Sequence, residues 1–97
     1  MASPLTIGTT AIVVAPINKK RDLVRFQNTG ATIFYIKKVP FEGVFTLPSA
    51  TDYEVLMQPS SSLTEAGDAF ETNSVAAFAA VSSAVGGILS VYETSKV

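Results

Sequence analysis

Apolar and polar residues alternate over short stretches of this chain, and residues that favour turns separate the stretches. Alternation with a period of two is typical of β-strands whose two faces meet different surroundings. In Leu23–Gln27, Val24 and Phe26 point to one face and the residues between them to the other. Leu5–Ala15 is rich in Thr, Ile and Val, which favour strands. Within it, Gly8 is expected to mark a bend between two short strands.

Thr32–Lys37 predicts a strand with two apolar faces. Phe34 and Ile36 share one face, and Ile33 and Tyr35 share the opposite one. A strand of this kind is central in a sandwich, or its outer face is covered by another chain.

The segment Asn28-Thr29-Gly30 separates Leu23–Gln27 from Thr32–Lys37. A short loop with Asn and Gly between two alternating strands predicts a β-hairpin. We therefore expect Asn28 and Gly30 to be the turn residues of a hairpin, with Gly30 at a positive φ.

Three further strands are expected at Val44–Leu47, Tyr53–Met57 and Ile88–Glu93, the last after a turn at Gly86-Gly87. With the strands above they make seven or eight short strands, separated by regular turns. This spacing of short strands and turns predicts an all-β fold, a small antiparallel β-sandwich or barrel. Ninety-seven residues suit a single domain, 1–97.

Ser74–Ser83 is open to two interpretations. It is rich in Ala, which has the highest helix propensity, and its bulkier residues recur near helical spacing. However, no capping pattern with a following Glu opens a helix here. Because every other expected element is a strand, we favour a strand for this segment.

Charged residues make up 15% of the chain, below the ~25% that is usual in globular proteins. A small domain with so few charges is expected to place part of its surface against a partner. The charges are also unevenly spread: residues 1–38 hold six basic side chains against Asp22, and residues 39–97 hold seven acids against Lys96. These charges either intermix in a folded sandwich or make a subunit with two oppositely charged parts, which would set its register against copies of itself.

The chain contains no Cys and no His. Thiol catalysis, zinc sites built on these ligands and imidazole acid–base chemistry are thereby excluded. Its serines lie in low-complexity contexts without an adjacent base, and its acidic residues do not match a calcium-binding loop. We therefore expect no enzyme activity, no catalytic residue, no metal site and no cofactor.

Two other partner classes are also disfavoured. The rings of Phe26 and Tyr35 could stack on the bases of a single nucleic-acid strand, and Lys19, Lys20, Arg21 and Arg25 could neutralise its phosphates. A pI near 5.2 and seven basic residues in all argue against this, so no nucleic acid is expected. The longest uncharged stretch, 72–92, is diluted by Ser, Ala and Gly, so no membrane span is expected either.

Roughly three quarters of the chain resembles small virion proteins of tailed bacteriophages. The resemblance rests on strand and loop residues rather than on reactive groups: Gly8, Thr9, Thr10, Ala15, Pro16, Asn18, Arg21, Leu23, Asn28, Gly30, Tyr35 and Ile36, then Ala80 through Ala84, Gly87, Leu89, Val91 and Glu93. Leu47-Pro48-Ser49-Ala50 departs from the Leu-x-Pro-Gly turn common in such proteins. The resemblance implies a β-sandwich on the outer capsid surface of the virion, a decoration or cement protein that binds major capsid protein and copies of itself, as a homotrimer.

For such a role, the expected contact residues are the Lys19, Lys20 and Arg21 loop, facing an acidic shell surface, together with the outward Ile33 and Tyr35 and the chain termini. Tyr and Arg are enriched at protein interfaces. An alternative is a head-fibre or tail-associated module that binds carbohydrate or a host surface through exposed tyrosines, although the chain has no Trp and only three Tyr. Another adaptor, fibre or minor structural role in the virion is the third alternative.

Overall fold

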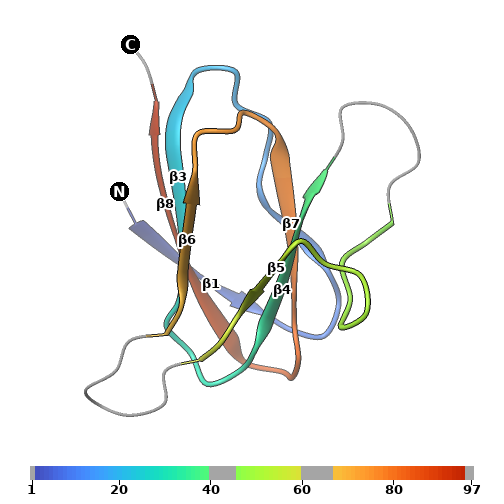
Figure 1. Ribbon diagram of the computed structural model, residues 1–97. Helices are drawn as coiled ribbons and strands as arrows, with labels where there is room; N and C mark the ends of the chain where they lie inside the picture. Colours follow the sequence, from blue (N-terminus) through green and yellow to red (C-terminus); the bar gives the residue numbers. More distant parts are fainter. Residues whose placement is uncertain (1, 40–45, 60–66, 96–97) are drawn as a thin grey trace.

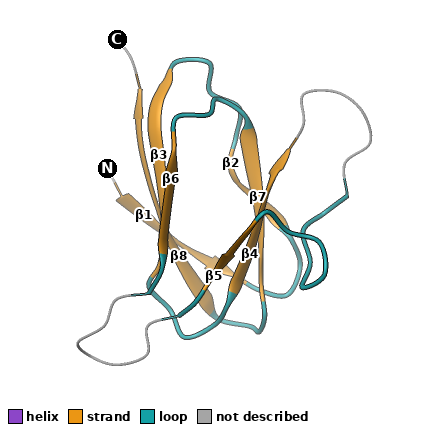
Figure 2. Cartoon of the chain, viewed as in Figure 1, coloured by secondary structure: helices purple, strands orange, loops and turns teal. Residues whose placement is uncertain are grey.

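The computed structural model describes residues 2–39, 46–59 and 67–95, which form two layers of β-strands (Figure 1). Loops connect the strands, and no helix occurs among the described residues (Figure 2). The strands are β1 (Ala2–Ile7), β2 (Ile12–Ala15), β3 (Arg21–Asn28), β4 (Phe34–Val39), β5 (Val55–Met57), β6 (Ala69–Thr72), β7 (Ala77–Ser82) and β8 (Gly87–Ser95). The predicted all-β sandwich is confirmed.

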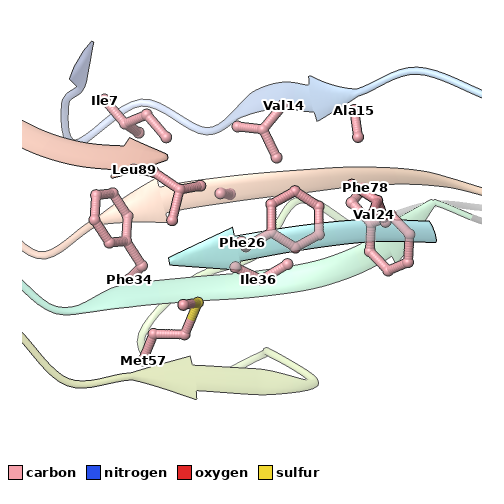
Figure 3. Close-up of a cluster of buried hydrophobic side chains, with 11 residues drawn as sticks. Ile7, Val14, Ala15, Val24, Phe26, Phe34, Ile36, Met57, Phe78 and Leu89 are labelled. Atoms are coloured by element: carbon pink, nitrogen blue, oxygen red, sulfur yellow. The ribbon is translucent and has the colours of Figure 1, made fainter. Parts of the chain in front are cut away.

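The strands form two four-stranded antiparallel sheets. Sheet A has the order β1-β8-β3-β6, and sheet B has the order β2-β7-β4-β5. The core lies between them, as Figure 3 shows. At its centre the ring of Phe26, from sheet A, meets the ring of Phe78, from sheet B, edge to face at 5.5 Å, and stacks on Phe70 at 6.4 Å. The predicted inward positions Val24, Phe26, Phe34 and Ile36 are all fully buried.

The break expected at Gly8 is present, and the chain changes sheet there. β1 ends at Ile7 and pairs with β8 in sheet A, whereas β2 begins at Ile12 and pairs with β7 in sheet B. The first strand-rich stretch therefore contributes one edge strand to each sheet.

Part of Ser74–Ser83 is a strand, as favoured over a helix. β7 covers Ala77–Ser82 and lies between β2 and β4. All six of its residues are buried, so both of its faces are covered. A helix-like composition therefore occupies a strand that is buried on both faces.

The predicted hairpin at Asn28–Gly30 is wrong. β3 belongs to sheet A and β4 to sheet B, so this loop crosses from one layer to the other instead of joining paired neighbours. The side chain of Asn28 is fully buried and holds the crossing: its Nδ2 donates to the carbonyl oxygens of Thr32 (2.7 Å) and Met57 (3.1 Å), and its Oδ1 accepts from the backbone N–H of Gly30 (3.1 Å).

Gly30 also differs from expectation, because its φ is not positive. A Cβ at this position would lie 2.7 Å from the backbone nitrogen of Ile88 in β8. Glycine is therefore needed for close approach of two backbones. Among the described residues, a positive φ occurs at Gly86, at 82°, in the expected turn between β7 and β8.

Of the remaining predicted strands, Tyr53–Met57 is shortened to β5 and Ile88–Glu93 is extended to β8. The Val44–Leu47 strand lies partly outside the described residues, and Thr46 and Leu47 are not in a strand.

Candidate interaction surfaces

The loop between β2 and β3 carries the predicted cationic contact residues. Lys19 and Lys20 are exposed at its turn. Asn18 supports the turn, because its Oδ1 accepts from the backbone N–H of Lys20 at 3.0 Å and its own backbone N–H donates to the carbonyl of Val75 at 3.0 Å. Two cations are thus presented at one end of the sandwich, the end at which β3 begins and β8 finishes (Figure 1).

Arg21, expected at the exposed tip of this loop, is instead buried, with 2% of its surface exposed. Its guanidinium forms an ion pair with Glu93 and donates to the carbonyl oxygens of Pro16 (2.7 Å), Ser74 (2.8 Å) and Ala76 (2.7 Å). Only Arg has enough donors in a fixed fork to satisfy four such acceptors. Arg21 therefore ties the loop to the segment before β7 and to β8, and its side chain is buried instead of exposed at the loop tip.

Segment 46–54 lies against the outer face of sheet B. Lys37 of β4 donates from Nζ to the carbonyl oxygen of Thr46 (3.0 Å) and to Oδ2 of Asp52 (2.8 Å). The ring of Tyr35 packs on that of Tyr53, with centroids 5.2 Å apart and planes tilted by 43°. The outward face of β4, including the predicted contact residue Tyr35, is thus partly covered by the chain itself.

A groove of about 650 Å³ remains beside this segment, lined by residues 9–11, 47–50 and 81–83 and by Tyr35. None of these described lining residues is charged. Ile33, the second predicted apolar contact residue, is half-buried and directly precedes β4. Its backbone N–H donates to Oγ of Ser83 (3.0 Å), and its carbonyl accepts from the backbone N–H of Ser83 (2.8 Å), so it adjoins the groove.

Five exposed apolar residues lie in the segments that line this groove or close to them in the sequence. Their exposed fractions are 42% for Ile12, 57% for Val13, 57% for Leu47, 41% for Tyr53 and 83% for Val85. We call these five residues and the groove the groove surface. It combines β2, segment 46–54 and the β7–β8 turn, and only folding brings these distant parts of the chain together.

The outer face of sheet A has a different chemistry. Cross-strand register places Tyr92 of β8, Arg25 of β3 and Glu71 of β6 in one row, and Ser90 and Gln27 in the next. With Leu23 these side chains line a shallow depression of about 330 Å³. The alternation in Leu23–Gln27 indicated that Leu23, Arg25 and Gln27 share a face, but nothing local indicated that β6 and β8 flank them.

The two ion pairs found among the described residues both link the cation-rich part of the chain with its acid-rich part: Arg21 with Glu93, and Lys37 with Asp52. At these two places the charges intermix, as expected for a sandwich built from interleaved segments.

The described residues contain no group of three acidic side chains close enough to hold a metal ion. Nor do they include a helix that is long and apolar enough to cross a bilayer. Comparison with protein-family models, with curated protein sequences and with solved structures finds no match to this chain.

Proposed function

We propose that this chain is a structural protein of a bacteriophage virion, a decoration or cement protein on the outer capsid surface that binds major capsid protein and copies of itself. The observation that supports this proposal best is the groove surface, a groove without a charged residue in its described lining and with exposed apolar residues in or near it, on a chain with only 15% charged residues. Exposed apolar patches of this kind mark sites of protein association.

Contacts between copies suit the groove surface. A domain of about this size buries only ~60–65% of the surface that its unfolded chain exposes, so its own core is small. Association through Val13 and Leu47 would bury further apolar area and stabilise each subunit by mass action. A homotrimer is the proposed state.

Contact with the shell suits the cationic end of the sandwich, which carries Lys19 and Lys20, in contrast to the apolar groove surface. Both side chains are exposed, whereas the adjacent Arg21 is held inside by Glu93. Two exposed cations at a turn suit an acidic shell surface, where they would raise the association rate and fix orientation. In this arrangement no nucleic acid, membrane or cofactor takes part.

Deleting the gene from the phage that encodes the chain tests the cementing role. We expect depleted particles to lose DNA on heating or osmotic shock under conditions that complete particles survive. Re-addition of purified wild-type protein should restore resistance. If depleted particles prove as robust as complete ones, the cementing role is refuted.

The shell-facing end is tested by re-adding the Lys19→Glu/Lys20→Glu variant to depleted particles. We expect weaker binding, with the largest difference at low ionic strength, because exposed charges are screened by salt. Lys38→Glu, an exposed charge change on β4, is the matched control. Equal binding of both variants and wild type would place the shell contact elsewhere.

A further inference from the structure

The depression on the outer face of sheet A lies away from both surfaces used above. Tyr92 stands at one side of it, with 38% of its surface exposed, and Glu71 stands at the other side, across β3. Two strand spacings separate them, about 10 Å. Arg25 and Gln27 lie on β3 between them, and Leu23 and Ser90 also line the depression.

The polar groups of this depression are uncommitted. Within the described part of the chain, no hydrogen bond or ion pair engages the side chains of Arg25, Gln27, Glu71 or Tyr92. Arg25 and Glu71 are cross-strand neighbours of opposite charge, yet they do not form an ion pair with each other. Both groups are therefore available to a ligand, one as a pure donor and the other as a pure acceptor.

We propose that this depression binds a neutral carbohydrate. A sugar hydroxyl both donates and accepts, so adjacent hydroxyls can satisfy Arg25 and Glu71 at once, while Gln27 and Ser90 can act in either sense. The electron-rich face of the Tyr92 ring suits the C–H face of a pyranose. Because Arg25 and Glu71 offset each other, the depression does not select for ligand charge.

A protein partner fits this place less well than a sugar does. Leu23 and Tyr92 are the bulky apolar or aromatic residues among those that line it, and the depression is small and shallow. Protein interfaces of standard size bury roughly 800 Å² per partner around an apolar centre. A single sugar residue needs only one ring to stack on and a few convergent polar groups.

This inference goes beyond the cementing role and does not depend on it. A subunit attached to the shell through its lysine end and to its neighbours through the groove surface would leave the outer face of sheet A accessible. The sequence also allowed a module that binds carbohydrate through exposed tyrosines. In this proposal, Tyr92 is the tyrosine that contacts the sugar. Tyr53 is excluded from this site because it lies on the opposite sheet, against Tyr35.

The test uses the full chain labelled with ¹⁵N and titrated with the methyl glycosides of glucose, galactose, mannose and N-acetylglucosamine. We expect at least one sugar to shift amide signals of Arg25, Gln27, Ser90 and Tyr92 with millimolar affinity, and not those of residues 47–50. Absence of shifts with all four sugars, or shifts confined to sheet B, would overturn the proposal.

Substitutions identify the groups responsible. Tyr92→Ala should weaken binding at least about tenfold, whereas Tyr92→Phe keeps the ring and should retain most of the affinity. Glu71→Gln should weaken binding without altering the thermal midpoint, since Glu71 is exposed. Tyr53→Ala is the matched control. If Tyr53→Ala reduces affinity as much as Tyr92→Ala does, the sugar does not bind at this depression. The outcome of the sugar titrations, positive or negative, leaves the particle experiments on the cementing role unaffected.

Discussion

Arg21 follows two exposed lysines in the chain, yet its guanidinium is enclosed by the carbonyl oxygens of Pro16, Ser74 and Ala76 and the carboxylate of Glu93. Its side chain is fully buried, and that of Glu93 keeps 30% exposure. A charge enclosed in this way needs every one of its partners, because an unpaired buried charge or acceptor is costly. Arg21 therefore acts as a structural tie.

Arg21→Ala should destabilise the fold by about 3 kcal/mol, because it leaves Glu93 and three carbonyl oxygens without their donor. Arg21→Lys should recover only part of this loss, since an ammonium cannot reproduce the fork of donors. Urea unfolding followed by circular dichroism measures both effects. Lys20→Ala is the control and should stay within about 0.5 kcal/mol of wild type. An equally small effect of Arg21→Ala would show that its enclosure adds little.

At the scale of elements, the link between β3 and β4 decides how the chain passes from one sheet to the other. Asn28 supplies the hydrogen bonds that a hairpin ladder would otherwise provide, and Gly30 lets the link approach the backbone of β8. The local sequence is equally suited to a hairpin. Core packing decides between them, because with β3 and β4 in opposite layers Phe26 and Phe34 enter the core from its two sides.

Gly30→Ala should destabilise the protein by about 1–3 kcal/mol, because its Cβ would meet backbone rather than a flexible side-chain end. The matched control is Gly8→Ala, whose Cβ would meet Val85 at an ordinary 4.0 Å. Thermal unfolding of the two variants makes the comparison. A smaller loss at Gly30 than at Gly8 would contradict the close approach of the link to β8.

β7 shows the same dependence on surroundings. Its alanines favour a helix in isolation, but β2 and β4 pair with it on both sides. Ala80 belongs to the core, and Ala79, on the opposite face, lies between Val13 and Lys37. Small side chains suit a strand that is crowded on both faces, so burial outweighs a propensity difference of less than ~1 kcal/mol per residue.

At the scale of the whole molecule, the two sheets present outer faces of different character. Sheet B carries the groove surface, whose described groove lining holds no charged residue, and sheet A carries a depression lined by Arg25 and Glu71. This difference is consistent with the two proposals above, in which sheet B contacts other copies of the chain and sheet A binds a ligand.

Sedimentation velocity should detect association of the 10.2 kDa chain into a trimer as concentration rises. Val13→Lys combined with Leu47→Lys should shift the protein towards monomer, because each change places a charge in an apolar contact. Ile88→Lys alters a similarly exposed apolar residue on sheet A and should leave association unchanged. A wild-type monomer at high concentration would contradict a preformed trimer, and an effect of Ile88→Lys alone would move the contact to sheet A.

The sequence by itself determined the all-β class, the inward positions Val24, Phe26, Phe34 and Ile36, and the bend at Gly8. These follow from alternation and turn chemistry, which act over a few residues. It also placed Tyr35 on the face of its strand opposite Phe34 and Ile36, since successive side chains of a strand point to opposite faces.

Only the tertiary structure decided which strands share a sheet, that Arg21 is buried, and that Tyr92, Arg25 and Glu71 stand in one row. Each depends on partners far along the chain: Glu93 for Arg21, and β8 and β6 for Arg25. A hairpin and a crossing between layers use the same turn residues, so local chemistry cannot distinguish them. The free energy of packing the two inner faces together makes that choice.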